Sequence, residues 1–135
     1  MTKTRVSTFL VFTFLAQLAF PCSYIGDPPS IDDLLNDLAN RSNNYDLIFR
    51  ASIEVKGKRT LLHIKEDFKG TANEVIDYQQ PTSCDQYFED DVDDAIIFAW
   101  YFNDRLHISD SIGAIESKHV RFQEALRTLR AMSFN

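Results

Sequence analysis

The two cysteines, Cys22 and Cys84, are the residues of this chain whose chemistry can be predicted most directly. A basic start, with Lys3 and Arg5, leads into an apolar run over residues 6–20. That run is too short to cross a bilayer comfortably, and polar sequence follows it at once, which is typical of a secretion signal. Export would place the chain in an oxidising compartment, where we expect the two cysteines to form one disulfide.

This interpretation divides the chain into a signal peptide, residues 1–21, and one domain, residues 22–135. The predicted Cys22–Cys84 bridge would anchor the start of the mature chain to its middle, and it would stabilise the fold by roughly 2–4 kcal/mol. We therefore expect a secreted or extracytoplasmic protein, in the periplasm or cell envelope if the source is bacterial.

A run of carboxylates between residues 85 and 94 is the second candidate for chemistry. Its members are Asp85, Glu89, Asp90, Asp91, Asp93 and Asp94. Carboxylate oxygens suit calcium, but the spacing differs from that of an EF-hand loop and lacks its glycine. The favoured interpretation is a solvated, self-repelling loop that discourages pairing at a strand edge.

Three histidines, His63, His107 and His119, show no metal-ligand spacing and have no neighbouring cysteine. We expect His63 and His107 in strands, at the surface or on a barrel face. The sequence contains no Ser-His-Asp order, no glycine-rich phosphate loop and no HExxH pattern. We therefore predict no enzyme, no cofactor and no metal site of the protein's own.

Composition limits the classes of partner. The chain carries 14 basic and 20 acidic residues, for a net charge of −6, and 44% of its residues are hydrophobic. An acidic chain without a basic stripe cannot release counterions from a phosphate backbone, which argues against nucleic acid. About 115 residues remain after the signal, enough for a single domain with one modest core, and we expect a monomer.

A short helix is predicted over residues 31–40, because four apolar residues recur there at helical spacing. Ser30 is the expected N-cap, with Asp33 forming a partial capping box. A second amphipathic helix is expected over residues 117–132, where apolar residues share one face and two arginines suit the C-terminal dipole.

Strands are expected between the two helices. Period-2 alternation and apolar runs predict them at residues 49–55, 60–67, 74–78, 95–102 and 105–109, with turns at Lys56-Gly57-Lys58 and Asn103-Asp104. Trp100, within the most apolar of these strands, is expected in the core. The predicted fold class is mainly β: a five-stranded OB-like Greek-key barrel with two flanking helices.

The order of several short motifs resembles the inhibitory domain of the tissue inhibitors of metalloproteinases and the related netrin-like modules. The motifs are Phe68-Lys69-Gly70, Pro81-Thr82-Ser83-Cys84 with Phe88 beyond, Ile97-Phe98-Ala99 and Leu106-His107-Ile108-Ser109. The resemblance covers residues 22–111. It implies that Cys22 pairs with Cys84, as the first mature cysteine of that family does.

The chain departs from the family pattern at several places, among them the absence of the glycine that precedes the central strand. Tyr24 stands where the family has its second cysteine, and Ser111 stands where that cysteine's partner is expected, so both halves of one bridge are missing together. Asp85 replaces the glycine that follows the loop cysteine. Glycine normally supplies a positive φ at such a position, so the local turn geometry is open to question.

The resemblance also implies a mechanism. In the family, the free amine and carbonyl of the N-terminal cysteine chelate the zinc of an extracellular metalloproteinase, and the next side chain enters the adjacent pocket. The corresponding residues would be Cys22 and Ser23, with Tyr24 and Ile25 along the cleft. A rigid bridge would lower the ordering cost of binding.

The site of signal cleavage decides between alternatives. Cleavage before Cys22 would free its amine but places Pro21, a poor residue, at the scissile position; cleavage after Ala19 would leave Phe20 and Pro21 blocking the amine. A lipid anchor on Cys22 would instead make an envelope protein without inhibitory activity, with membrane contact through the lipid alone. A secreted module with a purely structural disulfide is the third alternative.

Asn40 begins a glycosylation sequon that is relevant only in a eukaryotic source.

Overall fold

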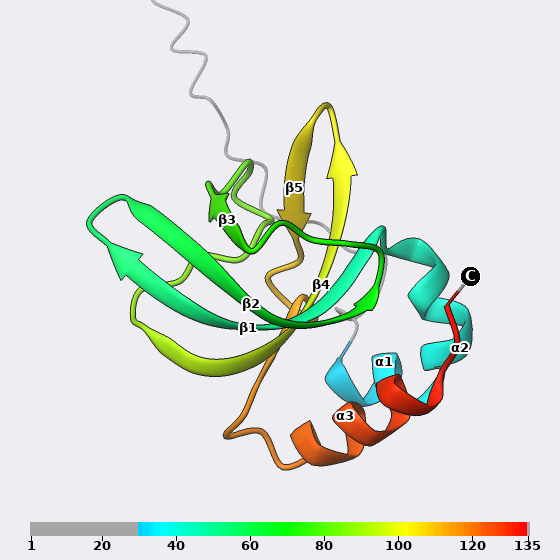
Figure 1. Cartoon of the computed structure of the whole chain (residues 1–135). Coiled ribbons are helices and arrows are strands. Elements are labelled where there is room, and N and C mark those ends of the chain that lie inside the picture. The colour runs from blue at the N-terminus through cyan, green and yellow to red at the C-terminus, as the bar shows by residue number, and fades with distance from the viewer. Residues whose placement is uncertain (1–29, 135) are drawn as a thin grey trace, which may run out of the picture.

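The computed structural model describes residues 30–134 (Figure 1). The elements in chain order are α1 (Ile31–Asn36), α2 (Leu38–Arg41), a 3₁₀ turn (Ser42–Asn44), β1 (Leu47–Lys56), β2 (Arg59–Lys69), β3 (Val75–Tyr78), β4 (Val92–Phe102), β5 (Arg105–Ile108), β6 (Ala114–Glu116) and α3 (Phe122–Ala131). None of these helices is long and apolar enough to cross a membrane.

The first helical segment begins where the sequence predicts. The Ser30 hydroxyl accepts from the Asp33 backbone N–H at 3.1 Å, and the Asp33 carboxylate accepts from the Ser30 N–H at 3.0 Å, which completes the capping box. The single helix expected over residues 31–40 is interrupted at Asp37, whose φ of −133° and ψ of 38° are not helical. The last helix starts at Phe122, later than predicted, because residues 117–121 form turns.

The sheet is antiparallel, and its strands follow the order β3-β2-β1-β4-β5, with β6 also paired to β4. All five predicted strands are present. The mainly β fold class is confirmed, but the five-stranded OB-like barrel is not, because β3 and β5 do not pair and the six-stranded sheet is not closed between them. Register shifts along β1, each with an extra residue in the paired strand β2 or β4, accompany the strong curvature that Figure 1 shows.

Strand β6 is the element that the sequence analysis missed. It has three residues, and it pairs with β4 on the same side as β5 does, next to it along the strand. The chain must therefore turn tightly between β5 and β6. Gly113 makes this possible, because a Cβ there would collide with the backbone of Ser109.

The sheet has a hydrophobic core on each face. Alternation along β1 and β4 sends Ile48, Ile96 and Phe98 to one face, where the three helices cover them (Figure 1). Phe49 and Ile97 point to the other face, which the curved sheet encloses. Two-sided burial explains why residues 95–99 form a continuous apolar run.

Candidate functional site

The segment that carries Cys84 connects β3 to β4 and is bound to the end of β5. The Gln86 backbone N–H donates to the Ile108 carbonyl at 2.6 Å, and the Asp110 N–H donates to the Cys84 carbonyl at 3.2 Å. An isolated antiparallel bridge joins Asp85 to Ser109 between these two bonds. The segment that follows Cys84 is thus attached to the end of β5 by β-type hydrogen bonds on both sides of Asp85.

Asp85 organises the turn that precedes this attachment. One of its carboxylate oxygens accepts from the Thr82 hydroxyl at 2.7 Å and from the Thr82 backbone N–H at 3.0 Å. The Thr82 hydroxyl in turn accepts from the Cys84 N–H at 3.1 Å. Asp85 does not adopt the positive φ of a glycine, and its side chain, 3% exposed, holds the turn instead. The turn therefore forms without a glycine at this position, because the Asp85 carboxylate bonds Thr82.

His107 reaches the same carboxylate from β5. Its Nδ1 lies 3.1 Å from one Asp85 oxygen and 3.2 Å from the other. Because a carboxylate can only accept, this contact assigns the ring proton to Nδ1. The imidazole stacks on Trp100, with ring centroids 5.5 Å apart, and meets the edge of Phe102. His107 lies in a strand, as predicted. It is buried, at 9% exposure, so the predicted surface position is wrong for this residue.

Two further bonds fix the segment from the β3 side. Tyr78 donates its hydroxyl to the Gln86 carbonyl at 2.7 Å, and Gln80 donates its side-chain amide to the Asp85 carbonyl at 2.8 Å. Burial raises the pKa of the Tyr78 hydroxyl, which keeps the phenol in its donating form. The segment therefore has polar attachments to both neighbouring strands.

The acidic run predicted as one solvated loop is divided in the structure. Asp85 lies buried at the Cys84 end, whereas Asp94 belongs to β4 and accepts two hydrogen bonds from Arg50, at 2.8 and 2.5 Å. The Arg50 guanidinium lowers the pKa of Asp94. Glu89 and Asp90 between them are exposed, as predicted. In the described part of the chain, no three acidic, histidine or cysteine residues are grouped so as to hold a metal.

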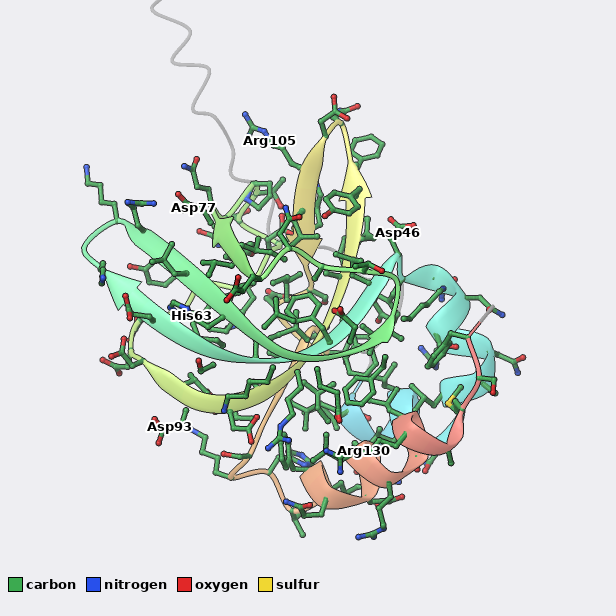
Figure 2. All side chains as sticks on the ribbon, viewed as in Figure 1. Asp46, His63, Asp77, Asp93, Arg105 and Arg130 are labelled. Carbon is green, nitrogen blue, oxygen red and sulfur yellow. The ribbon has the colours of Figure 1, made fainter. Side chains whose placement is uncertain are left out.

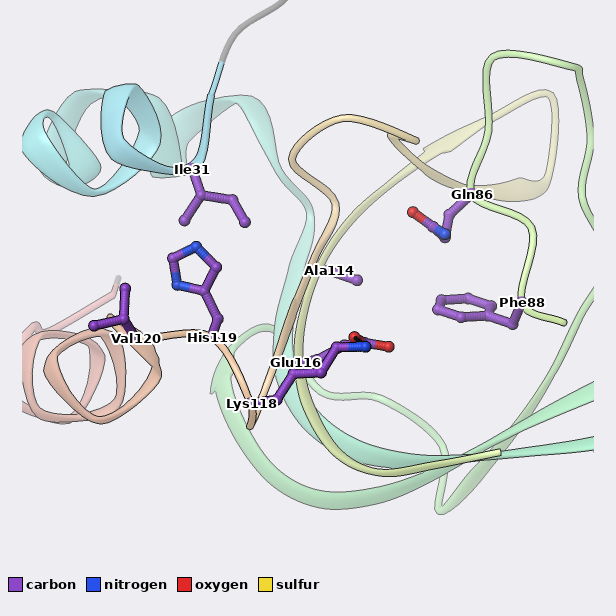
Figure 3. Close-up of a pocket in the computed structure, with 8 residues that line it drawn as sticks. All are labelled: Ile31, Gln86, Phe88, Ala114, Glu116, Lys118, His119 and Val120. Atoms are coloured by element: carbon purple, nitrogen blue, oxygen red, sulfur yellow. Dashed lines mark ion pairs between the residues drawn. The ribbon is translucent and has the colours of Figure 1, made fainter. Parts of the chain in front are cut away.

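A groove of about 500 Å³ opens beside this segment (Figure 3). Gln86 and Phe88 form one wall, and Ile31, His119 and Val120 form the opposite wall. The remaining lining residues are Ala114, Glu116 and Lys118, of which the last two form an ion pair at 2.9 Å. Val120 is 92% exposed, so an apolar side chain stands at the mouth of the groove.

The residues predicted to contact a protease, Cys22, Ser23, Tyr24 and Ile25, lie outside the described residues, as does the predicted signal peptide. The Cys22–Cys84 bridge accordingly stays a prediction. Of the residues tied to the family pattern, the structure brings Cys84, Asp85 and Ser109 together beside His107. Ser111, which the resemblance would align with the partner of the missing cysteine, lies near them, and its hydroxyl is 3.1 Å from that of Ser109.

The Asp85–His107 contact was missed because its two residues are 22 positions apart in the sequence. The bonds between Thr82 and Asp85 could have been predicted, because the two residues have the spacing of a capping box, in which each residue bonds the other's backbone or side chain.

The comparisons with known proteins identify no family: no family model, curated protein or solved structure matches this chain.

Proposed function

We propose that this protein is a secreted protein-interaction module whose binding end is built around Cys84. The observation that carries the proposal is the attachment of the segment beside Cys84. Its backbone bonds Ile108 at the end of β5 and Asp110 just beyond it, and the buried Asp85 carboxylate holds the preceding turn. A loop connecting two strands needs no such attachment for folding alone. A rigid platform is what a tethered N-terminus requires if it is to present a fixed surface to a partner.

In its sharpest form, the proposal is that the protein inhibits an extracellular zinc metalloproteinase. The amine and carbonyl of Cys22 would chelate the partner's zinc, Ser23 would enter the adjacent pocket, and Tyr24 and Ile25 would lie along the cleft. The family resemblance supports this form, together with the OB-like relation that we propose for the open sheet. The antiparallel order of the five predicted strands is compatible with that relation.

The first experiment is an intact mass and N-terminal fragment map of the exported protein, with and without reduction. A chain that starts at unmodified Cys22 and gains two hydrogens on reduction supports the inhibitor. A chain that starts at Phe20 and is still bridged leaves a structural disulfide and removes the zinc mechanism. An acyl-glyceryl mass on Cys22 selects instead the alternative of a lipid-anchored envelope protein without inhibitory activity.

The second experiment measures inhibition of a panel of zinc metalloproteinases by the exported chain. A matched variant carries one added Ala before Cys22, which keeps the disulfide but blocks the amine. We expect the extension to weaken inhibition by about a hundredfold or more, the loss of roughly 3 kcal/mol of binding. Inhibition that survives the extension would exclude chelation, and a panel with no inhibited member would exclude the inhibitor altogether.

A further inference from the structure

The groove of about 500 Å³ beside residues 86–88 has apolar side chains on both of its walls (Figure 3). Phe88 lies on one wall, and Ile31 and Val120 lie on the other. Val120 directly precedes Arg121, the N-cap of α3, and an apolar side chain in that position often packs on the beginning of its helix. The 92% exposure of Val120 shows that it does not pack there. The groove therefore has apolar surface against which a further side chain can pack.

The polar side chains of the groove leave no net charge. Glu116 and Lys118 pair with each other at 2.9 Å. The His119 Nδ1 accepts a hydrogen bond from the Arg121 backbone N–H at 3.1 Å, which requires a neutral ring. A charged ligand thus finds no uncompensated partner among the lining side chains, and an apolar side chain suits the groove better.

One wall of the groove continues into Cys84. Gln86 and Phe88 line the groove, whereas Tyr87 between them is 60% exposed, as in an extended segment whose side chains alternate. Cys84 lies two residues before Gln86. The predicted Cys22–Cys84 bridge would therefore hold Cys22 close to this wall.

The opposite wall contains the other end of the same stretch of chain. Ile31 is the first residue of α1, and Ser30 before it has an extended backbone, with φ of −99° and ψ of 165°. Pro28 and Pro29 precede Ser30 in the sequence. Proline fixes its own φ and keeps the residue before it extended. We therefore expect residues 27–29 to form a stiff, extended lead into α1.

Seven residues, 23–29, connect the two walls. Fully extended, they span at most about 25 Å, which confines their path to the surroundings of the groove. Tyr24 and Ile25 are the only large apolar side chains among them besides the prolines. Neighbours in an extended chain point to opposite sides, so one of the two faces the groove and the other faces away. Ile25 is the better occupant, because it has no hydroxyl to leave without a partner.

We propose that residues 23–29 cross the groove and that the Ile25 side chain packs in it, in contact with Phe88 and Val120. Tyr24 then faces away from the domain. The disulfide alone would leave the start of the mature chain free to rotate, whereas the disulfide and Ile25 together fix its direction. A segment that is already fixed loses less conformational entropy when a partner binds it.

This inference rests on the Cys22–Cys84 bridge of the proposed function, and it refines that function. Ile25 packs against the domain itself and is withheld from the cleft of a protease. Ser23 and Tyr24 remain, with Cys22, as the residues that contact a partner.

The direct test is a NOESY spectrum of the exported, oxidised and isotope-labelled protein. We expect cross-peaks from the Ile25 methyl groups to the Phe88 ring and to the Val120 methyl groups, and none from the Tyr24 ring to either residue. A bridged chain without cross-peaks from Ile25 to any lining residue would overturn this inference alone. A chain without the Cys22–Cys84 bridge would overturn it together with the zinc mechanism.

Thermal denaturation of variants measures the contribution of the contact. Ile25→Asp should lower the melting temperature by about 4 °C or more, and Tyr24→Asp, the matched change on the outward side, by clearly less. Val120→Asp should lower it in the wild-type background and have no further effect together with Ile25→Asp, because substitutions of residues in contact are not additive. An equal or larger loss for Tyr24→Asp, or the same Val120→Asp shift in both backgrounds, would overturn the proposal.

Val75→Asp is the control for additivity. Val75 is another exposed valine, at 43%, in β3, and Figure 2 shows Asp77 of that strand far from Arg130 of α3. Its shift in melting temperature should be the same in the wild-type and Ile25→Asp backgrounds. A difference as large as that for Val120→Asp would overturn the assignment of the coupling to the groove.

A second copy of the chain is the other candidate occupant. A mixed sample of labelled and unlabelled protein separates contacts within one chain from contacts between chains. Cross-peaks at the groove that arise only between chains would assign it to a dimer interface and would overturn the proposal.

Discussion

Two four-residue segments of this protein, Ser30–Asp33 and Thr82–Asp85, have the same hydrogen-bond pattern but different structural roles. In Ser30–Asp33 and in Thr82–Asp85, the aspartate accepts from the hydroxyl and the backbone N–H of the residue three positions earlier, at 2.7–3.0 Å. The first pattern begins an exposed helix. The second forms a turn, in which Asp85 is buried and also contacts His107.

The difference between them comes from what surrounds each carboxylate. Asp33 faces solvent, and water can replace any partner it loses. Asp85 is closed in by Thr82, His107 and the end of β5, so a lost partner leaves a buried polar group unsatisfied. The same local motif therefore contributes little energy in one place and holds a buried turn beside β5 in the other.

Substitution of Asp85 should have the largest effect. We expect Asp85→Ala to lower the free energy of unfolding by about 3 kcal/mol, because the His107 Nδ1–H and the Thr82 donors lose a buried acceptor. Asp85→Asn, which keeps one acceptor oxygen, should cost less. Urea denaturation measures both. A loss below about 1 kcal/mol for the alanine variant would contradict the view that burial separates the two motifs.

The two hydroxyls should differ in the same direction as the two carboxylates. Ser30→Ala is expected to cost about 1 kcal/mol, the usual loss of an N-cap hydroxyl, because water can replace the lost partner of Asp33. Thr82→Ala should cost about 2 kcal/mol, because it removes a donor to the buried Asp85 carboxylate. The same denaturation measurement applies, and equal losses for the two variants would contradict the view that burial separates the motifs.

The pH dependence of the exposed motif should be small and of defined sign. Hydrogen bonds from Ser30 lower the pKa of Asp33 in the folded state. The stability that they contribute is therefore present above the pKa of the unfolded chain and is lost as the pH falls through the folded value. We expect the difference in melting temperature between wild type and Asp33→Asn to shrink between about pH 6 and pH 2. A difference that grows on acidification would contradict this assignment.

Asp90 serves as the null comparison within the acidic run. It is exposed and lies between the buried Asp85 and the paired Asp94. Asp90→Ala should change the free energy of unfolding by less than about 0.5 kcal/mol. A loss comparable to that of Asp85→Ala would mean that the run acts as one unit.

Much of the secondary structure followed from local patterns. Period-2 alternation located β1 and β2, the apolar run located β4, and the capping residues located the start of α1. The break at Asp37 and the short strand β6 were missed because no local sequence pattern predicts either of them. Strand β6 forms only through its pairing with β4 and the close turn at Gly113.

The residue types of the candidate site could be read from the chain, but their arrangement could not. The sequence alone shows Cys84, the spacing of Thr82 and Asp85, and the acidic character of residues 85–94. That Asp85 meets His107 while Asp94 meets Arg50, and that β3 and β5 remain apart, depends on contacts between residues distant in sequence. Burial and sheet closure are properties of such contacts, and a local pattern carries no information about which distant partner will remove a given carboxylate from water.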